Sequence, residues 1–147
     1  MNVVSKFIQK SIDTTYNESK LGLGLLFLRI FGAIALLRTH GLPKLLDIQG
    51  TMAHIPDPMG LGQTFSAYYA IFANVICAFL IMLGLLTRWA SAAVISITLS
   101  GLFIVHIADP AKVQDTPFIY SIVFITLIIL GPGKYSLDAV IAKKTKK

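Results

Sequence analysis

Long apolar stretches separated by short polar connections dominate the pattern of this chain. A helix needs about 20 mostly apolar residues to cross a bilayer. Such runs lie at residues 21–42, 67–86 and 89–107, and a shorter fourth run lies at 117–130. The pattern predicts an all-α fold: an integral membrane four-helix bundle that occupies residues 1–147 as a single domain.

Local signals predict where two of these helices begin or end. Thr116 and Pro117 fit the cap and the first turn of the fourth helix, where proline is tolerated. At about 1.5 Å per residue that helix reaches only about 21 Å. It therefore needs a thinned bilayer or must extend back towards Val113. Thr87-Arg88 alone separates the second run from the third, which predicts a tight hairpin.

Two polar regions outside these runs predict further elements. Apolar and basic positions recur at helical spacing in residues 4–13, which predicts a short N-terminal amphipathic helix on the membrane surface. A frayed tail is the alternative. Residues 45–66 hold prolines and glycines that exclude one continuous helix, but they keep apolar anchors such as Met52 and Met59. This segment predicts a capping outer loop over one mouth of the bundle.

Composition agrees with a membrane protein. Apolar residues make up 55% of the chain and charged residues 14%, and the mean hydropathy is +0.74. The net charge is +6, but the basic residues form short flanks rather than a basic helix face with stacking aromatics, which argues against nucleic-acid binding. The single cysteine, Cys77, excludes an internal disulfide and any multi-thiolate metal site.

The distribution of lysine and arginine predicts the orientation, because cytoplasmic loops are enriched in both. Lys44 and Lys112 fall on one side of the predicted bundle. Arg88, between the second and third spans, is the topology determinant of the other side, which both termini share. The full basic set there is Lys6, Lys10, Lys20, Arg88, Lys134, Lys143, Lys144, Lys146 and Lys147. Both termini are therefore expected to be cytoplasmic.

Arg29 is the most costly residue in the predicted membrane region, because a cation near mid-membrane costs roughly 2.5–3.5 kcal/mol on insertion scales. His40 follows it 11 residues later, only about 20° away around a helix axis. Asn74 in the second span offers an amide partner for Arg29, and the alternative is that it only fastens two helices together. With Lys44 and His106, these residues are the candidates for lining a pocket that faces outwards.

Other polar residues of the spans have simpler interpretations. Cys77 is expected to be a small packing residue, and the hydroxyls of the third span are expected to bond back to their own helix. His40, His54 and His106 invite a metal hypothesis, but no ligand spacing supports one, so no metal site is predicted. No cofactor follows from the residues themselves.

Several motifs together resemble the DoxX family of small bacterial membrane proteins. They are an arginine in the first span, the stretch from His40 to Leu45, the stretch Gly84-Leu85-Leu86-Thr87-Arg88, and Leu130 to Asp138. The resemblance runs from about Leu21 to Val140. It implies a four-helix bundle in the bacterial cytoplasmic (inner) membrane. Where members commonly carry a glutamate in the second span, this chain has Asn74, which removes an ionisable partner for Arg29.

The resemblance leaves three functions open. Some relatives are membrane subunits of thiosulfate:quinone oxidoreductases, which implies a quinone-linked redox subunit with quinone as its ligand. Others are said to assemble with detoxifying enzymes, which implies a non-catalytic membrane anchor or assembly module for a soluble protein partner. The third alternative is a small-solute transporter that works as a homo-oligomer. The residues show no self-sufficient catalytic constellation.

Overall fold

The computed structural model describes residues 3–4 and 17–145, and every regular element in these residues is a helix. Four helical segments are long and apolar enough to cross a membrane. They are Glu18–Leu46, Gln63–Leu83, Thr87–Val105 and Ala111–Leu130. The prediction of an all-α, multi-pass membrane protein is confirmed. The predicted N-terminal amphipathic helix lies outside the described residues.

The first three of these segments each contain a five-residue π-helical turn. Such turns widen a helix locally and are common at functional sites. The segments are α2 (Glu18–Leu36), η1 (Leu37–Gly41) and α3 (Leu42–Leu46); α5 (Gln63–Ile71), η2 (Phe72–Ile76) and α6 (Cys77–Leu83); and α7 (Thr87–Ser100) with η3 (Gly101–Val105). The remaining helices are α8 (Ala111–Leu130) and the two short ones, α4 (Ile48–His54) and α9 (Leu137–Thr145).

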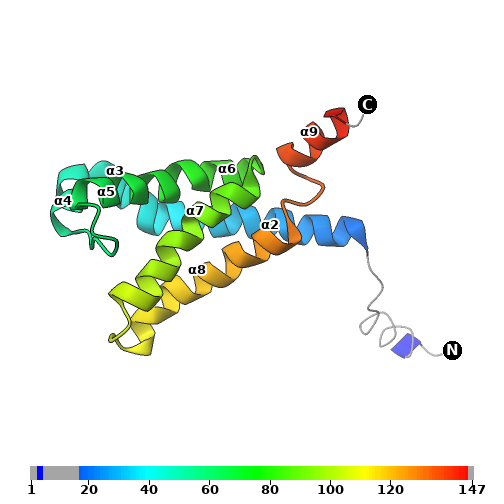
Figure 1. The fold of residues 1–147 in the computed structure, drawn as a ribbon. Helices are drawn as coiled ribbons and strands as arrows, with labels where there is room; N and C mark the ends of the chain where they lie inside the picture. The colour runs from blue at the N-terminus through cyan, green and yellow to red at the C-terminus, as the bar shows by residue number, and fades with distance from the viewer. Residues whose placement is uncertain (1–2, 5–16, 146–147) are drawn as a thin grey trace.

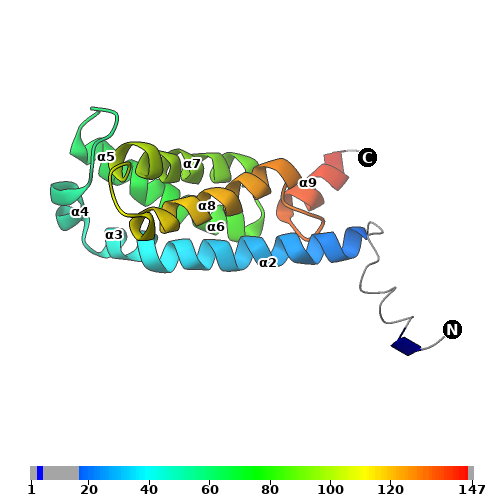
Figure 2. The same cartoon turned by 90° about the horizontal axis from the view of Figure 1, so that it is seen from below.

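The spans pack as neighbouring pairs. Helix α2 runs beside α6, and α7 packs along α8 (Figure 1). Helix α8 also contacts α2, and Figure 2 shows these two helices side by side. The α7–α8 pair is inclined to α2 in Figure 1, so the pairs of helices separate towards one end of the bundle.

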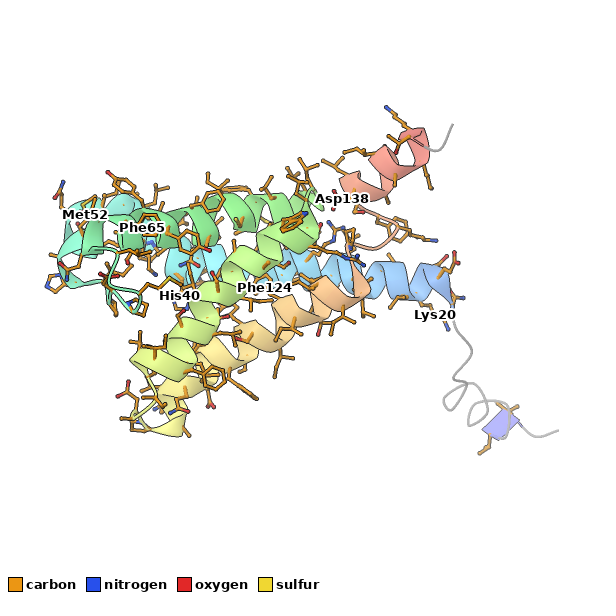
Figure 3. The ribbon with its side chains drawn as sticks, viewed as in Figure 1. Lys20, His40, Met52, Phe65, Phe124 and Asp138 are labelled. Carbon is orange, nitrogen blue, oxygen red and sulfur yellow. The ribbon has the colours of Figure 1, made fainter. Side chains whose placement is uncertain are left out.

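The two ends of the bundle differ. The terminal end holds the start of α2, the Gly84–Leu86 turn and the segment 131–136 that leads to α9. The capped end holds α3, α4 and the loop 55–62. Figure 3 labels Lys20 and Asp138 at the terminal end, and Met52 and Phe65 at the capped end. Residues 17 and 145 therefore lie at the same end, as an even number of crossings requires.

The interior is a small apolar core among α2, α6, α7 and α8. Phe124 and Leu127 of α8, Val94 of α7, Ile81 of α6 and Leu36 of α2 are fully buried. Large apolar side chains such as Phe27, Phe79 and Ile129 point outwards and are exposed. An apolar outer surface on helices of spanning length is what a lipid environment requires, because lipid tails replace water around it.

The connection between the second and third spans differs from the prediction. It is formed by Gly84–Leu86, and Thr87 already belongs to α7. Gly84 and Leu86 take positive φ values of 70° and 49°, which reverse the chain within three residues. The predicted tight hairpin is present, but the expected Thr87-Arg88 turn was wrong because those residues continue the next helix.

The fourth span begins before Pro117, so the prediction that Pro117 lies in its first turn was wrong, whereas the alternative of an extension back towards Val113 is confirmed. Helix α8 begins at Ala111 with Pro110 before it, so Pro117 lies inside the helix rather than in its first turn. Proline is tolerated inside membrane helices when neighbouring groups satisfy the freed backbone. The missing N–H of Pro117 frees the carbonyl of Val113, one turn earlier in the helix. With 20 residues, α8 is long enough to cross a bilayer without local thinning.

Candidate functional site

Arg29 lies in a junction at the terminal end, where its guanidinium meets backbone carbonyls. Its side chain is fully buried. Nη2 donates to the carbonyl of Tyr135 at 2.6 Å, and Nη1 donates to the carbonyls of Ile81 and Met82 at 3.3 and 3.4 Å. The last two carbonyls lie in the final turn of α6, where the helix dipole is negative and carbonyls have no partner within the helix. Three backbone acceptors thus compensate this cation.

Gly84 makes room for that guanidinium. A Cβ atom at this position would collide with Nη1 of Arg29, and the residue also takes a left-handed conformation that favours glycine.

Asn74 is not the partner of Arg29. It lies in η2, before α6, and no hydrogen bond joins it to Arg29 within residues 17–145. The partner of Arg29 is therefore the end of α6 together with the segment after α8.

Asp138 closes the same junction from the other side. Its carboxylate accepts from the backbone N–H groups of Leu86 and Thr87 at 2.8 and 3.0 Å, and its own N–H donates to the Gly84 carbonyl at 2.8 Å. The carboxylate thereby caps the start of α7, whose preceding residue has no side-chain cap. Figure 3 shows Asp138 beside the α6–α7 turn. The two stretches 84–88 and 130–138 therefore meet in space and hold the terminal end together.

A cavity of about 240 Å³ lies at the capped end, between α5, α7 and the loop 55–62. We refer to this loop as the lid. Most of the cavity wall is apolar and comes from the lid, from Phe65 and from Ile97 to Val105. Its polar lining residues are Lys44, Ser66, Tyr69, Ser96, Ser100 and His106. A concave, mainly apolar site with a few polar groups is typical of small-molecule sites.

The hydroxyl groups of this wall are already paired within the protein. The hydroxyls of Tyr69 and Ser96 are 2.8 Å apart, and Ser96 also donates to the Ala93 carbonyl at 2.7 Å. Ser100 donates to the Ser96 carbonyl at 2.7 Å. The prediction that hydroxyls of the third span bond back to their own helix is confirmed for these serines. The hydroxyl donors of this wall are therefore used within the protein, and Lys44 and His106 are the lining side chains with N–H or ring-nitrogen groups left for a ligand.

Lys44 and His106 reach the cavity from different elements. Lys44 of α3 donates from Nζ to the His40 carbonyl at 3.0 Å, which uses one of its three N–H bonds. His106 follows η3, and its Nδ1 lies 2.7 Å from a carboxylate oxygen of Asp109. The second ring nitrogen of His106 is left for another partner. A cation and an imidazole thus stand at one apolar cavity.

The lid is organised by Asp57. Its carboxylate accepts from the N–H groups of Leu61 and Gly62 at 3.1 and 2.7 Å and from the Ser66 hydroxyl at 2.9 Å. The hydrogen bond from Gly62 is the main reason that the pKa of Asp57 is lowered from its ordinary value, with the bonds from Ser66 and Leu61 contributing less. The charged form of one side chain therefore ties the lid to the start of α5.

The structure separates the five candidates from the sequence. Lys44 and His106 line the cavity, whereas Arg29 belongs to the terminal-end junction. His40 stacks edge-on against Tyr120, with ring centroids 5.6 Å apart. Asn74 is buried in η2, where its backbone lies against Gly41 of η1. Arg88, the orientation residue, is exposed at the start of α7.

Sequence reasoning passed over three residues of this site. Asp57 stands between Pro56 and Pro58 before two glycines, a pattern typical of a side chain that caps a turn. Asp109 follows His106 by three residues, close enough for a local ion pair. Tyr69 carried no comparable signal, because an aromatic residue in an apolar helix is usually a packing residue. No group of three potential metal ligands occurs within the described part of the chain.

Comparison with known proteins adds the family. The DoxX family model matches residues 24–107. The chain belongs to the DoxX family. The DoxX match contains Arg29 and Gly84 of the terminal-end junction, but not Tyr135 or Asp138, and it contains every lining residue of the cavity, including Lys44 and His106. No curated protein and no solved structure matches the chain.

Proposed function

We propose that this DoxX-family protein is the membrane subunit of a quinone-linked redox system, and that its capped-end cavity holds a quinone ring. The cavity volume of about 240 Å³ carries the proposal. A cavity of about 150 Å³ already accommodates benzene, so this one has room for a substituted single ring. Its apolar wall suits the ring faces, and Lys44 and His106 supply hydrogen bonds for ring oxygens.

The rim of the cavity suits a lipid-soluble ligand. Met59, Leu61 and Phe65 line the cavity and are exposed apolar residues. On a protein with four spanning helices, such a rim lies next to lipid and gives an apolar tail a path from the cavity into the bilayer. A water-soluble substrate would not need that path.

The expected setting is the bacterial cytoplasmic membrane with the terminal end facing the cytoplasm. Lys20, Arg88, Lys134, Lys143 and Lys144 are all exposed at the terminal end. At the capped end, Lys44 and Lys112 are the lysines. The positive-inside rule then places the cavity near the outer face.

Binding of a short-chain benzoquinone to the full chain in lipid nanodiscs tests the proposal. Ala70→Phe fills the cavity, because Ala70 lines it and is otherwise buried. Ala92→Phe makes the same change on the exposed face of α7 and serves as the matched control. We expect wild type and Ala92→Phe to bind with similar Kd, and Ala70→Phe to bind at least about tenfold more weakly, a difference of about 1.4 kcal/mol. Absence of binding by the wild type refutes the proposal.

A second candidate function is a membrane anchor for a soluble protein partner. Helix α9 projects from the bundle at the terminal end (Figure 1), and its last turn carries the exposed residues Lys143 and Lys144. A projecting basic helix outside the spans is suited to an acidic partner surface. Mild detergent extraction should then recover a stoichiometric partner that is lost when Lys143 and Lys144 are both changed to Glu.

A further inference from the structure

We infer that His106, oriented by Asp109, is the residue that hydrogen-bonds a ring oxygen of the ligand in the capped-end cavity. The ligand class is accordingly an oxygenated ring that exists both as a hydrogen-bond acceptor and as a donor, such as a quinone and its hydroquinone. This inference rests on the proposed function, because it specifies how the same cavity recognises its ligand.

The backbone of His106 is fixed on both sides. Its N–H donates to the Gly101 carbonyl at 2.8 Å, which ends η3. Its carbonyl accepts from Asp109 N–H at 3.1 Å and from the amide of Gln114 at 2.9 Å. The residue therefore sits at a defined place on the cavity wall rather than on a loose loop.

The side chain of His106 is also oriented. Asp109 places a carboxylate oxygen 2.7 Å from Nδ1, and a carboxylate only accepts hydrogen bonds. Nδ1 must then carry the proton, which leaves Nε2 to face another partner. A carboxylate behind a histidine fixes its tautomer in this way.

This arrangement suits both forms of a quinone-type ligand. With a neutral ring, Nε2 accepts a hydrogen bond from a hydroxyl of the hydroquinone. With a charged ring, Nε2 donates to a carbonyl of the quinone. Lys44 has only donors, and two of its N–H bonds remain after the bond to the His40 carbonyl, so it suits the second ring oxygen.

The pair also connects the cavity with the exterior. His106 lines the cavity, and its side chain and that of Asp109 are 36% and 45% exposed. A proton accepted from a ligand hydroxyl can therefore be passed on to water at the capped end. The charged side chains on the elements around His106 are Asp109 on its own turn, Lys44 on α3, Asp57 in the lid, and Lys112 and Asp115 near the start of α8.

Substitutions of His106 and its neighbours distinguish a direct contact of His106 with the ligand from a role of His106 in supporting the turn. His106→Asn keeps a donor near the Nδ1 position, so the bond to Asp109 and the turn are retained, but the group at Nε2 is lost. His106→Gln keeps a polar group near Nε2. Asp109→Asn keeps an acceptor for Nδ1 but weakens the hydrogen bond that orients the ring, because a neutral amide replaces the carboxylate. Asp115→Asn, an exposed carboxylate of α8, is the matched control.

The experiment measures Kd for a short-chain benzoquinone, its hydroquinone and the dimethyl ether of the hydroquinone, with the full chain in nanodiscs. We expect the wild type to bind hydroquinone about tenfold more tightly than the ether, because only the hydroquinone can donate a hydrogen bond to Nε2. His106→Asn should lose this preference over the ether, and Asp109→Asn should reduce it.

Two results would overturn the inference, and they differ. If the wild type binds quinone but His106→Asn and Asp109→Asn keep its preference for hydroquinone over the ether, the inference fails and the proposed function stands. If the wild type binds none of the rings, both fail together. Thermal stability of each variant in the same nanodiscs identifies any variant that has lost its fold, and His106→Gln then provides the independent comparison.

Discussion

The guanidinium of Arg29 donates a 2.6 Å hydrogen bond to the backbone carbonyl of Tyr135, 106 residues later in the chain. This bond joins the first membrane helix to the segment that follows the fourth. It also explains how the chain keeps an arginine at a buried position without a hydrogen bond to Asn74. The end of α6 and the Tyr135 carbonyl supply the negative potential that an acidic residue would otherwise provide.

Removal of the guanidinium should destabilise the bundle. Arg29→Met loses the three charge-assisted hydrogen bonds that join α2 to α6 and to Tyr135, so we expect the free energy of unfolding to fall by about 2–5 kcal/mol. Arg29→Lys should lie between this variant and the wild type, because lysine cannot reproduce the planar fork. Unfolding by SDS in mixed micelles measures the change.

The matched control for this prediction is Arg38→Met, because Arg38 is exposed in η1. Its free energy of unfolding should change by less than about 0.5 kcal/mol. Equal stability of Arg29→Met and Arg38→Met would show that the junction does not hold the terminal end together.

A methyl group at position 84 should damage the same junction from the other side. Gly84→Ala places a Cβ against Nη1 of Arg29 and in a left-handed backbone conformation. We expect the free energy of unfolding to fall by at least about 2 kcal/mol, because backbone strain and the displaced hydrogen bond both destabilise the folded state. Gly24→Ala is the control, because a Cβ there meets nothing within 4 Å. If the two variants unfold similarly in SDS, the close approach of Gly84 to the Arg29 guanidinium is contradicted.

Asp138 should contribute to stability as a helix cap supplied by a distant segment. Asp138→Ala removes the acceptors of the Leu86 and Thr87 N–H groups, and losing a cap costs about 1–2 kcal/mol. Asp138→Asn keeps one acceptor oxygen and should lose less. Asp115→Ala, which removes an exposed carboxylate with no side-chain hydrogen bond among residues 17–145, should be neutral. Hydrogen exchange at the start of α7 should quicken only in the Asp138 variants.

The spans could be predicted from sequence because a bilayer selects for length and apolar composition, and both are visible in the residues. The partner of Arg29 could not be predicted, because its acceptors are backbone carbonyls that any residue carries. Arg29 and His40 lie only about 20° apart around the helix axis, but they are far apart along it. Eleven residues correspond to a rise of about 16 Å, which places the two side chains at different levels of the membrane.

The cavity, too, could be predicted only in part from the sequence. Lys44 and His106 could be proposed as candidates because polar residues near span ends are conspicuous. Their meeting at one cavity depends on the lid, whose course is set by Asp57 and by two glycines with positive φ. The sequence did not fix the start of α8 because Pro117 resembles a first-turn proline, whereas a membrane setting also makes an internal proline acceptable.

Acidification should release the lid. The pKa of Asp57 is lowered from its ordinary value of 3.8, so its contribution is complete above about pH 3.8 and is lost as the pH falls through the lower folded pKa. A spin label at Met59→Cys should therefore become more mobile below that pH. Asp57→Asn should give a mobile label at every pH. A label whose mobility follows the same pH profile in wild type and Asp57→Asn would show that Asp57 does not hold the lid.

The orientation can be tested with single cysteines, because Cys77 is only 1% exposed and gives little background labelling. Ala53→Cys places a thiol on α4 at the capped end, and Ala142→Cys places one on α9 at the terminal end; both positions are exposed. The excess of lysine and arginine at the terminal end predicts that this end faces the cytoplasm. A membrane-impermeant maleimide applied to spheroplasts should then label Ala53→Cys at once and Ala142→Cys only after lysis. The reverse pattern would place the cavity on the cytoplasmic side, where a partner enzyme in the cytoplasm could exchange electrons with a bound quinone directly.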